Sequence, residues 1–352
     1  MIAHVVGVRP NYVKAAPLIN NLNNVDQVVI NTGQHYDKIL SDDIIKSLGM
    51  TRPDVNLGVS GDNGVFNRLG SLMESLADTL STYNPSLLVV YGDVDSTLAA
   101  SIVASRLGIP VAHVESGLRS FDNRMPEEIN RKIVDSIADL HFATEPSAVE
   151  NLENEGITKT VRLVGNSMID SLVKVIKSES FKSSPYDNQK NVLLTCHRQS
   201  NVDNKNNLEE ILRMCSGIDK KIVFPVHPRT RNKMKQFGVY QEFKHLRNLE
   251  LIDPLDYCNF LKMMNTSSVV ITDSGGIQEE TTFLGIPCLT IRKNTERPST
   301  VMYGTNTLVC FNEVSHYIDQ INNFRYKTHK VLENWDGKAG ERIASHIREY
   351  LG

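Results

Sequence analysis

The stretch SVVITDSGGIQEETTFLG (268–285) combines an apolar strand, a turn with two glycines and a short helix. Two glycines let a phosphate group approach the backbone closely, and the free N–H groups and dipole of the following helix favour an anion there. Glu279 or Glu280, one turn into that helix, could accept two hydrogen bonds from a ribose diol. A plain strand–helix turn with Ser274 as its N-cap would open in the same way, but the acidic pair directly behind the glycines favours nucleotide binding.

Strand-like segments of this kind recur along the chain and alternate with helix-like segments. The strand candidates are IAHVVG (2–7), DQVVINT (26–32), SLLVVYGD (86–93), VAHVES (111–116), DLHFAT (139–144), VRLVG (161–165), NVLLTCH (191–197), KIVFPVH (221–227), LELIDP (249–254), SVVITDS (268–274) and PCLTIR (287–292). Their continuous apolar character suits parallel sheets covered on both faces. Between them, Ile129, Ile133, Ile137 and Leu140 recur at helical spacing and predict one apolar stripe along a helix.

This alternation predicts two Rossmann-like, doubly wound α/β domains, with ligands at the carboxyl ends of the strands. A polar stretch at 178–190 interrupts the pattern and marks the border region between the domains. We expect an N-terminal domain over 1–168, a C-terminal domain over 169–335 and a last helix over 336–352. The pattern allows this helix to pack back on the N-terminal domain.

The composition excludes several classes of protein. A formal net charge of -3 gives no reason to expect nucleic acid or an anionic membrane as partner. No apolar run approaches the ~20 residues that span a bilayer. The five cysteines are odd in number and form no C-x-x-C pair, which argues against a disulfide framework or a zinc ribbon. MIAHVVGVRP at the N-terminus lacks a basic segment, so it is not a signal peptide and the expected compartment is the cytoplasm.

Charged residues of the N-terminal half fall where strands are predicted to end. Arg9 and Lys14 lie near the start of the first predicted helix, where cations oppose the helix dipole and an anion would compensate for them. A lysine alone is usually a solvated surface residue, but the pair at a strand end favours a functional role. Asp93 and Glu115 each follow an apolar strand, where α/β proteins place their chemistry. Glu127 lies in the first turn of a helix, where a glutamate is also common for dipole reasons alone.

Two alternatives concern metals. Asp93-Val94-Asp95 has the D-x-D pattern with which many sugar-transfer enzymes hold a metal–phosphate group, so a magnesium site remains an alternative. In the C-terminal half, His197 and His227 each follow a predicted strand and stand beside arginines, which indicates anion-binding positions. No cysteine–histidine spacing connects them, which argues against zinc.

Taken in order, these segments are similar to one known family. GVRPNYVKAAP, TGQHYD, YGDVDST, HVESGLRSFDNRMPEEINR, HRQSN, HPRTR, TDSGGIQEE and TERP resemble the non-hydrolysing UDP-N-acetylglucosamine 2-epimerases over about residues 1–305. The resemblance implies a GT-B-like pair of Rossmann-like domains with the active site in the cleft between them. It also implies a homodimer, a UDP-sugar substrate and no metal or redox cofactor. The implied reaction is anti elimination of UDP to 2-acetamidoglucal, followed by re-addition of UDP after C2 is reprotonated on the opposite face.

The resemblance also implies roles for individual residues. Asp93, Glu115 and Glu127 match the family's acid/base carboxylates, and His197 matches the histidine that assists departure of UDP. Which carboxylate serves which face of C2 is left open. The matching substrate-binding positions are Arg9, Lys14, Arg131, Ser274, Gly275, Gly276 and Glu280, to which the strand-end pattern adds His227.

The chain departs from the family at several positions. The usual H-R-x-E-N is HRQSN, and Asp37, Asp62 and Gln199 replace glutamines or arginines that many bacterial members use to bind a second, activating UDP-GlcNAc. Added negative charge there predicts turnover without such an activator. Relatives that act on diacetamido-uronic or 6-deoxy sugars share some of these motifs. A hydrolysing epimerase, which GVRPN disfavours, a GT-B glycosyltransferase and a catalytically silent UDP-sugar sensor are the rival interpretations.

Overall fold

The structure is a computed structural model, and it describes the chain except for residues 34–43, 60–63, 184, 187–189 and 331. The chain divides into two compact units. Unit 1 comprises Met1–Val175 and Glu333–Gly352, and unit 2 comprises Ile176–Leu332. The border expected at residue 168 falls inside a helix that belongs to unit 1, and the polar stretch lies early in unit 2.

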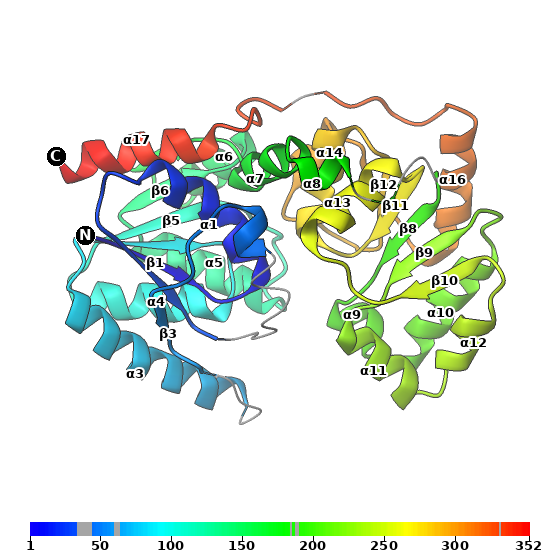
Figure 1. Ribbon diagram of the computed structural model, residues 1–352, viewed down its shortest axis with the longest axis horizontal. Coiled ribbons are helices and arrows are strands. Elements are labelled where there is room, and N and C mark those ends of the chain that lie inside the picture. The colour runs from blue at the N-terminus through cyan, green and yellow to red at the C-terminus, as the bar shows by residue number, and fades with distance from the viewer. Residues whose placement is uncertain (34–43, 60–63, 184, 187–189, 331) are drawn as a thin grey trace. The chain divides into compact units, whose positions relative to one another are not determined.

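Within its described residues, unit 1 contains a seven-stranded sheet in the order β3-β2-β1-β4-β5-β6-β7, with every neighbouring pair parallel. The strands are β1 (Ile2–Val6), β2 (Gln27–Asn31), β3 (Val55–Asn56), β4 (Leu87–Tyr91), β5 (Val111–Ser116), β6 (Leu140–Ala143) and β7 (Val161–Leu163). The helices are α1 (Arg9–Asn21), α3 (Val65–Tyr83), α4 (Asp95–Arg106), α5 (Pro126–Ile137), α6 (Pro146–Asn154), α7 (Ser167–Ile176) and α17 (Ala339–Leu351). Helices α3, α4 and α5 pack as one layer, and α1 packs beside α17 (Figure 1).

Unit 2 repeats this arrangement with a six-stranded sheet in the order β10-β9-β8-β11-β12-β13, again counted over the described part of the chain. Its strands are β8 (Val192–Thr195), β9 (Ile222–Pro225), β10 (Leu249–Ile252), β11 (Val269–Thr272), β12 (Cys288–Thr290) and β13 (Asn306–Leu308), all paired in parallel. Its helices are α8 (Glu179–Lys182), α9 (Gln199–Val202), α10 (Lys205–Ser216), α11 (Pro228–Gln236), α12 (Tyr240–His245), α13 (Tyr257–Thr266), α14 (Gly275–Leu284), α15 (Pro298–Met302) and α16 (Val314–Asn322), with a 3-10 turn at Phe311–Glu313.

Both sheets reverse their strand order at one point, between β1 and β4 in unit 1 and between β8 and β11 in unit 2. This is the doubly wound Rossmann order, in which ligands bind at the carboxyl ends of the strands beside the reversal. The predicted fold class is therefore confirmed for each unit. The strands beside the reversal are apolar and buried along their whole length, because helices cover both faces of the sheet.

Helix α5 differs from the predicted apolar stripe. Ile129 and Ile133 are 46% and 37% exposed, and Leu140 belongs to strand β6. The buried residues of α5 are Glu128, Asn130, Arg131, Val134 and Asp135. The predicted stripe was wrong because the charged side chains of α5 find partners inside unit 1, which outweighs the preference for burying isoleucine.

The C-terminal segment is held on unit 1 by polar contacts with buried backbone groups. The Asp170 carboxylate accepts hydrogen bonds from the backbone N–H groups of Ala339 (3.1 Å) and Gly340 (2.7 Å). The indole N–H of Trp335 donates to the carbonyl of Thr144 at 3.0 Å. Among the described residues, no helix combines the length and the apolar character needed to cross a membrane.

Candidate active site

In unit 1 a buried ion pair joins Lys14 of α1 to Glu115 of β5. Their Nζ and Oε2 atoms lie 2.5 Å apart, and the two side chains are only 7% and 4% exposed. A buried charge is tolerated when an opposite charge and hydrogen bonds replace the water that it has lost. Lys14 is therefore not a solvated surface lysine. Its expected neighbour Arg9 is half-buried at the start of the same helix.

The backbone at Glu115 is unusual for a residue with a side chain. Its φ is +74°, and the pairing of β5 with β6 shifts register between Val114 and Ser116. Positive φ at a non-glycine residue costs energy and clusters at functional sites, where the surrounding structure enforces it. Across the site, Gly92 has a φ of +66°, and a Cβ there would lie 2.7 Å from Lys14 Nζ. Glycine at position 92 thus leaves room for the ammonium group beside Glu115.

The second carboxylate of unit 1, Asp93, lies two residues after the end of β4 and is held by Arg131 of α5. Arg131 Nε and Nη2 lie 3.0 and 2.9 Å from Asp93 Oδ2, and Arg131 Nη1 lies 2.5 Å from Glu128 Oε2. Glu128 is fully buried and also accepts from the backbone N–H groups of Ser120 (2.8 Å) and Phe121 (3.1 Å). Arg131, predicted as a substrate-binding residue, is 2% exposed and links Asp93 to Glu128.

The D-x-D interpretation does not fit the surroundings of these carboxylates. Asp95 Oδ2 lies 3.0 Å from Arg68, and its Oδ1 accepts from Asn130 Nδ2 at 3.3 Å. Asp93 faces the Arg131 guanidinium. Each carboxylate of the pair is therefore neutralised by an arginine, whereas a divalent cation needs these oxygens as ligands. The described residues also contain no cluster of three or more His, Cys, Asp or Glu side chains suited to a metal.

Glu127 lies in the first turn of α5, directly after Pro126, and is half-buried. The same turn carries Asn130, whose Nδ2 donates to the backbone carbonyl of Asp93 at 2.9 Å. Helix α5 thus ties the position of Glu127 to the loop that follows β4. The predicted carboxylates Asp93 and Glu115 follow or end adjacent strands, and Glu127 belongs to the helix bonded to the first of them.

In unit 2 the site is organised by Asp273, a fully buried residue directly after β11. Its carboxylate accepts hydrogen bonds from the backbone N–H groups of His197 (3.0 Å) and Arg198 (2.9 Å), from Asn201 Nδ2 (3.0 Å) and from the Cys196 thiol (3.0 Å). Burial alone would raise the pKa of Asp273, but the neighbouring His197 and the hydrogen bonds lower it below its usual value. Asp273 therefore acts as an ionised anchor for the loop after β8.

His197, predicted as catalytic, lies on that anchored loop. Its Nδ1 is 3.3 Å from Asp273 Oδ1, and its side chain is 41% exposed. The His227 ring lies beside it, with ring centroids 5.6 Å apart. His227 precedes α11 and its Nδ1 accepts from the Arg229 backbone N–H at 3.2 Å. The structure therefore brings the two predicted histidines together at the carboxyl ends of β8 and β9.

The glycine turn of unit 2 has the form expected for binding an anion. Ser274 is the N-cap of α14 by position, yet within the described chain its side chain makes no capping hydrogen bond. Ser274 therefore does not act as the side-chain N-cap that the alternative interpretation expected. A Cβ on Gly275 would lie 2.6 Å from Arg297 Nη1 and 2.8 Å from Glu296 Oε1, so this position requires glycine. Gly276 follows in the first turn of α14.

The two acidic residues behind the glycines have different partners. Glu279 is fully buried and lies 2.9 Å from Arg297 Nε. Glu280 is 3% exposed, and its Oε1 accepts a hydrogen bond from the Tyr257 hydroxyl at 2.8 Å. Because the carboxylate of Glu279 is already paired with Arg297, Glu280 is the better candidate for binding a ribose diol, as the resemblance implied.

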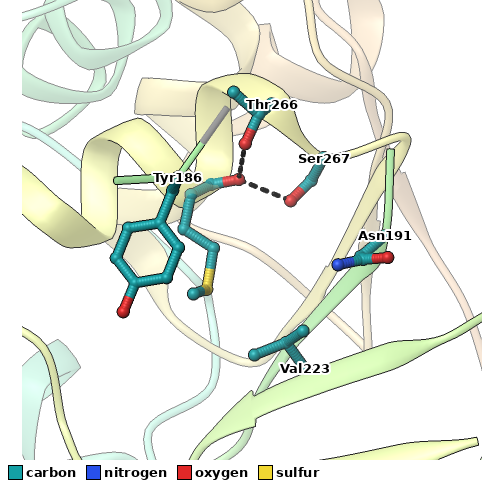
Figure 2. Close-up of a pocket in the computed structure, with 6 residues that line it drawn as sticks. Tyr186, Asn191, Val223, Thr266 and Ser267 are labelled. Carbon is teal, nitrogen blue, oxygen red and sulfur yellow. Dashed lines mark hydrogen bonds between the residues drawn. The ribbon is translucent and has the colours of Figure 1, made fainter. Parts of the chain in front are cut away.

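A small cavity in unit 2 lies away from these residues (Figure 2). Its volume is about 10 Å³, room for about one water molecule, and its lining includes Asn191 and Ser267, which precede β8 and β11. The hydroxyls of Thr266 and Ser267 both donate to the carbonyl of Met263. The cavity thus opens at the amino ends of these strands, opposite His197, and its hydroxyls are already bonded.

Several residues of the sites were not predicted from the sequence. Asp273 lies inside the quoted glycine turn, but only the serine and glycines behind it were predicted. Glu128 and Asp135, with the predicted Arg131 between them, follow the spacing i, i+3, i+7, a polar stripe that signals a buried charged helix face. Two predicted departures from the family, Asp37 and Asp62, lie outside the described residues.

Known proteins share this arrangement. A family model for UDP-N-acetylglucosamine 2-epimerase matches residues 18–348. A UDP-N-acetylglucosamine 2-epimerase homolog of Methanococcus maripaludis is 40% identical over 320 residues, 89% of each chain. The crystal structure of Methanocaldococcus jannaschii UDP-GlcNAc 2-epimerase in complex with UDP-GlcNAc and UDP is similar with a TM-score of 0.90 and 36% identity over 99% of both chains.

One relative carries a different substrate in its name. The UDP-2,3-diacetamido-2,3-dideoxy-D-glucuronate 2-epimerase of Pseudomonas aeruginosa is 33% identical over 99% of each chain. The structural likeness assigns the two units to the GT-B-like class of folds. The extent of the family match, together with the strand-end carboxylates of unit 1 and the glycine turn of unit 2, shows that this chain belongs to the UDP-N-acetylglucosamine 2-epimerase family.

Proposed function

We propose that this chain interconverts UDP-N-acetylglucosamine and UDP-N-acetylmannosamine without hydrolysis, by anti elimination of UDP and its re-addition to 2-acetamidoglucal. The observation that carries the proposal is the pair of enclosed carboxylates in unit 1. Glu115 is ion-paired to Lys14 and Asp93 to Arg131, at the ends of the adjacent strands β5 and β4. Enclosed, cation-paired carboxylates next to one another suit proton transfer better than metal binding.

The chemistry explains why two such groups are needed. The C2–H bond of the sugar is a weak acid, so a positioned carboxylate must remove the proton, and a second acid must return it from the opposite face. Asp93, Glu115 and Glu127 are the groups proposed for these steps. The cations beside Asp93 and Glu115 orient both carboxylates before the substrate arrives.

Unit 2 is proposed to bind UDP and to assist its departure. The N-terminus of α14, with Ser274, Gly275 and Gly276, would receive the diphosphate, because its backbone N–H groups and dipole favour an anion. Glu280 would bind the ribose. His197, oriented by Asp273, would stabilise the negative charge that develops on the leaving phosphate.

Three other reactions are distinguishable from this one. A hydrolysing epimerase would release N-acetylmannosamine and UDP, and a glycosyltransferase would need an acceptor. The relative from Pseudomonas aeruginosa makes a UDP-diacetamido-uronic acid the main alternative substrate.

Incubation with UDP-GlcNAc in D2O, followed by NMR, separates these cases. We expect deuterium at C2, the manno configuration in the UDP-linked sugar and no free sugar. Free N-acetylmannosamine would establish the hydrolysing reaction. Absence of deuterium at C2 of UDP-GlcNAc, with exchange in UDP-diacetamido-glucuronate, would establish the alternative substrate.

We also propose that the chain forms a homodimer, as its resemblance to the family implied. Ile129 and Ile133 on the outer face of α5 are apolar side chains that a second copy would cover. Sedimentation equilibrium of the wild type and of Ile129→Asp/Ile133→Asp tests this, with a shift of the variant to monomer as the expected result. A monomeric wild type would refute it.

A further inference from the structure

Two fully buried residues of unit 1, His113 and Asp135, connect the strand ends that carry the carboxylates. His113 is in the middle of β5 and Asp135 is in the second half of α5. His113 Nδ1 lies 2.6 Å from Asp135 Oδ1, and His113 Nε2 lies 2.8 Å from the backbone carbonyl oxygen of Gly92. The imidazole ring therefore spans from α5 to the peptide that precedes Asp93.

Both partners of this ring are hydrogen-bond acceptors. A backbone carbonyl oxygen such as that of Gly92 can only accept. Asp135 is ionised, since its other oxygen, Oδ2, lies 2.7 Å from Arg119 Nη1 and accepts from the Gly117 N–H at 3.1 Å. Burial would raise the pKa of Asp135, but the charges and hydrogen bonds of His113 and Arg119 lower it below its usual value. A neutral imidazole has one N–H donor, and only the imidazolium has two.

The charges around the ring alternate in sign. Asp135 lies between His113 and Arg119, and Arg119 continues to Glu155 with distances of 2.8 and 2.6 Å. A cation at His113 completes two cation–carboxylate pairs, whereas a neutral ring would leave one net negative charge, since Asp135 and Glu155 would share Arg119 alone. The neighbouring histidine in register on β6, His141, is different: burial above all lowers its pKa, and the positive charge on His113 acts in the same direction.

We propose that His113 donates hydrogen bonds from both ring nitrogens, as an imidazolium does, and that His113 and Asp135 together position the two carboxylates of unit 1. Through the ring, Asp135 fixes the Gly92 carbonyl immediately before Asp93. Through Oδ2, the same carboxylate fixes the Gly117 N–H two residues after Glu115, at the bulge where Glu115 has positive φ. The catalytic consequence rests on the function proposed above, while the charge state of the ring does not.

The charge state is tested by ¹⁵N NMR of protein labelled at histidine, with His113→Gln used to identify the resonances. We expect both ring nitrogens of His113 to carry protons, because both face hydrogen-bond acceptors. A ring with one unprotonated nitrogen would overturn the imidazolium.

The positioning role is tested with Asp135→Asn, which removes the countercharge and keeps the size of the side chain. Hydrogen exchange by mass spectrometry should show faster exchange in the segments that contain Asp93 and Gly117. His141→Gln is the matched control, because His141 is a buried histidine one strand away whose ring nitrogens bond to Thr160 and to the Asp135 backbone carbonyl. Unchanged exchange in Asp135→Asn would overturn the role. Should Asp135→Asn not fold, His113→Gln makes the same measurement.

Measurements of turnover test whether the positioning by His113 and Asp135 matters for the reaction. A small misplacement of a reacting group can cost about 10²-fold in rate, so kcat of Asp135→Asn should fall on the order of 10²-fold with KM nearly unchanged. The His141→Gln control should keep both values. A normal kcat in Asp135→Asn would overturn the link to catalysis. Failure of the wild type to exchange C2–H would instead refute the proposed function. The NMR and hydrogen-exchange results would still test the proposed roles of His113 and Asp135.

Discussion

Units 1 and 2 have the same doubly wound strand order but different chemistry at the ends of their strands. In unit 1, the loop after β4 and the end of β5 carry Asp93 and Glu115, each paired with a nearly buried cation. In unit 2, β8 and β11 lead to a half-exposed histidine and a glycine turn. The comparison shows that one strand order can present cation-paired carboxylates in one unit and a histidine with a glycine turn in the other.

Both sites depend on a buried aspartate that is itself only an acceptor. Asp273 anchors the loop of His197 from the neighbouring strand, and Asp135 reaches Gly92 and Gly117 from a helix. Each has a pKa below its usual value although burial opposes this. An ionised carboxylate inside a unit can thus organise several backbone groups at once. It accepts directly from N–H groups such as those of His197 and Gly117, and Asp135 reaches the Gly92 carbonyl through the His113 ring, which donates to it.

The largest expected effect is on the carboxylates of unit 1. Glu115→Gln and Asp93→Asn should each lower kcat by about 10²–10⁴-fold, the usual cost of losing a general acid or base. UDP affinity, measured by calorimetry, should be little changed, because the glycine turn and His197 belong to unit 2. Deuterium incorporation at C2 is the readout.

The matched control for this pair is Asp95→Asn. Asp95 lies two residues after Asp93 and is likewise paired with an arginine, Arg68. It should retain most of the activity. A loss of activity in Asp95→Asn as large as in Asp93→Asn would support the D-x-D interpretation. It would also contradict the proposed difference in chemistry between the units.

The next prediction concerns the stability of unit 1, whose free energy of unfolding should depend on pH through His4. Burial lowers the pKa of His4 in β1 from its usual value of 6.5 to about 4. Between these values the unfolded chain binds a proton that the folded chain does not, so the contribution of His4 is present at neutral pH and is lost as the pH falls from 6.5 to 4. At about 1.4 kcal/mol per pKa unit, it amounts to about 3 kcal/mol.

Trp335, the single tryptophan, is buried in unit 1 and reports its unfolding by fluorescence. Asp170 acts in the opposite direction, because burial raises its pKa to about 6 and its protonation in acid stabilises the folded state. The informative quantity is therefore the difference between wild type and His4→Gln. It should shrink by about 3 kcal/mol from pH 7 to pH 4. A difference that is independent of pH would contradict the buried neutral histidine.

A smaller effect is expected for the anchor of unit 2. Hydrogen bonds to a charged group contribute about 1.5–3 kcal/mol, so Asp273→Asn should lower the free energy of unfolding of unit 2 by about that amount and weaken UDP binding. Cys196→Ala, which removes one donor to the same carboxylate, is the milder control. Unaltered UDP affinity in a folded Asp273→Asn would show that the loop of His197 does not need this anchor.

The sequence determined the main features of the fold because apolar strands and turn residues are local signals. It did not reveal β3 and β13, two edge strands of only two and three residues. Helix α5 was misjudged because its charged residues are buried by partners distant in sequence. The resemblance located Lys14 and Glu115, but their contact joins residues about a hundred positions apart, which no spacing rule predicts. The positive φ of Glu115 depends on that contact network and left no sign in the residue type.

The smallest expected effect concerns metal. Exhaustive treatment with EDTA should leave the initial rate of C2 exchange unchanged, because the oxygens of Asp93 and Asp95 face Arg131 and Arg68. A divalent cation would have to displace two guanidinium groups and bring the carboxylates onto one centre, at the cost of two ion pairs. The apoprotein is compared with samples given back Mg²⁺ or Mn²⁺. Loss of turnover on chelation with recovery on either metal would mean that unit 1, like unit 2, is built around a phosphate, and the proposed division between proton transfer and anion binding would fail.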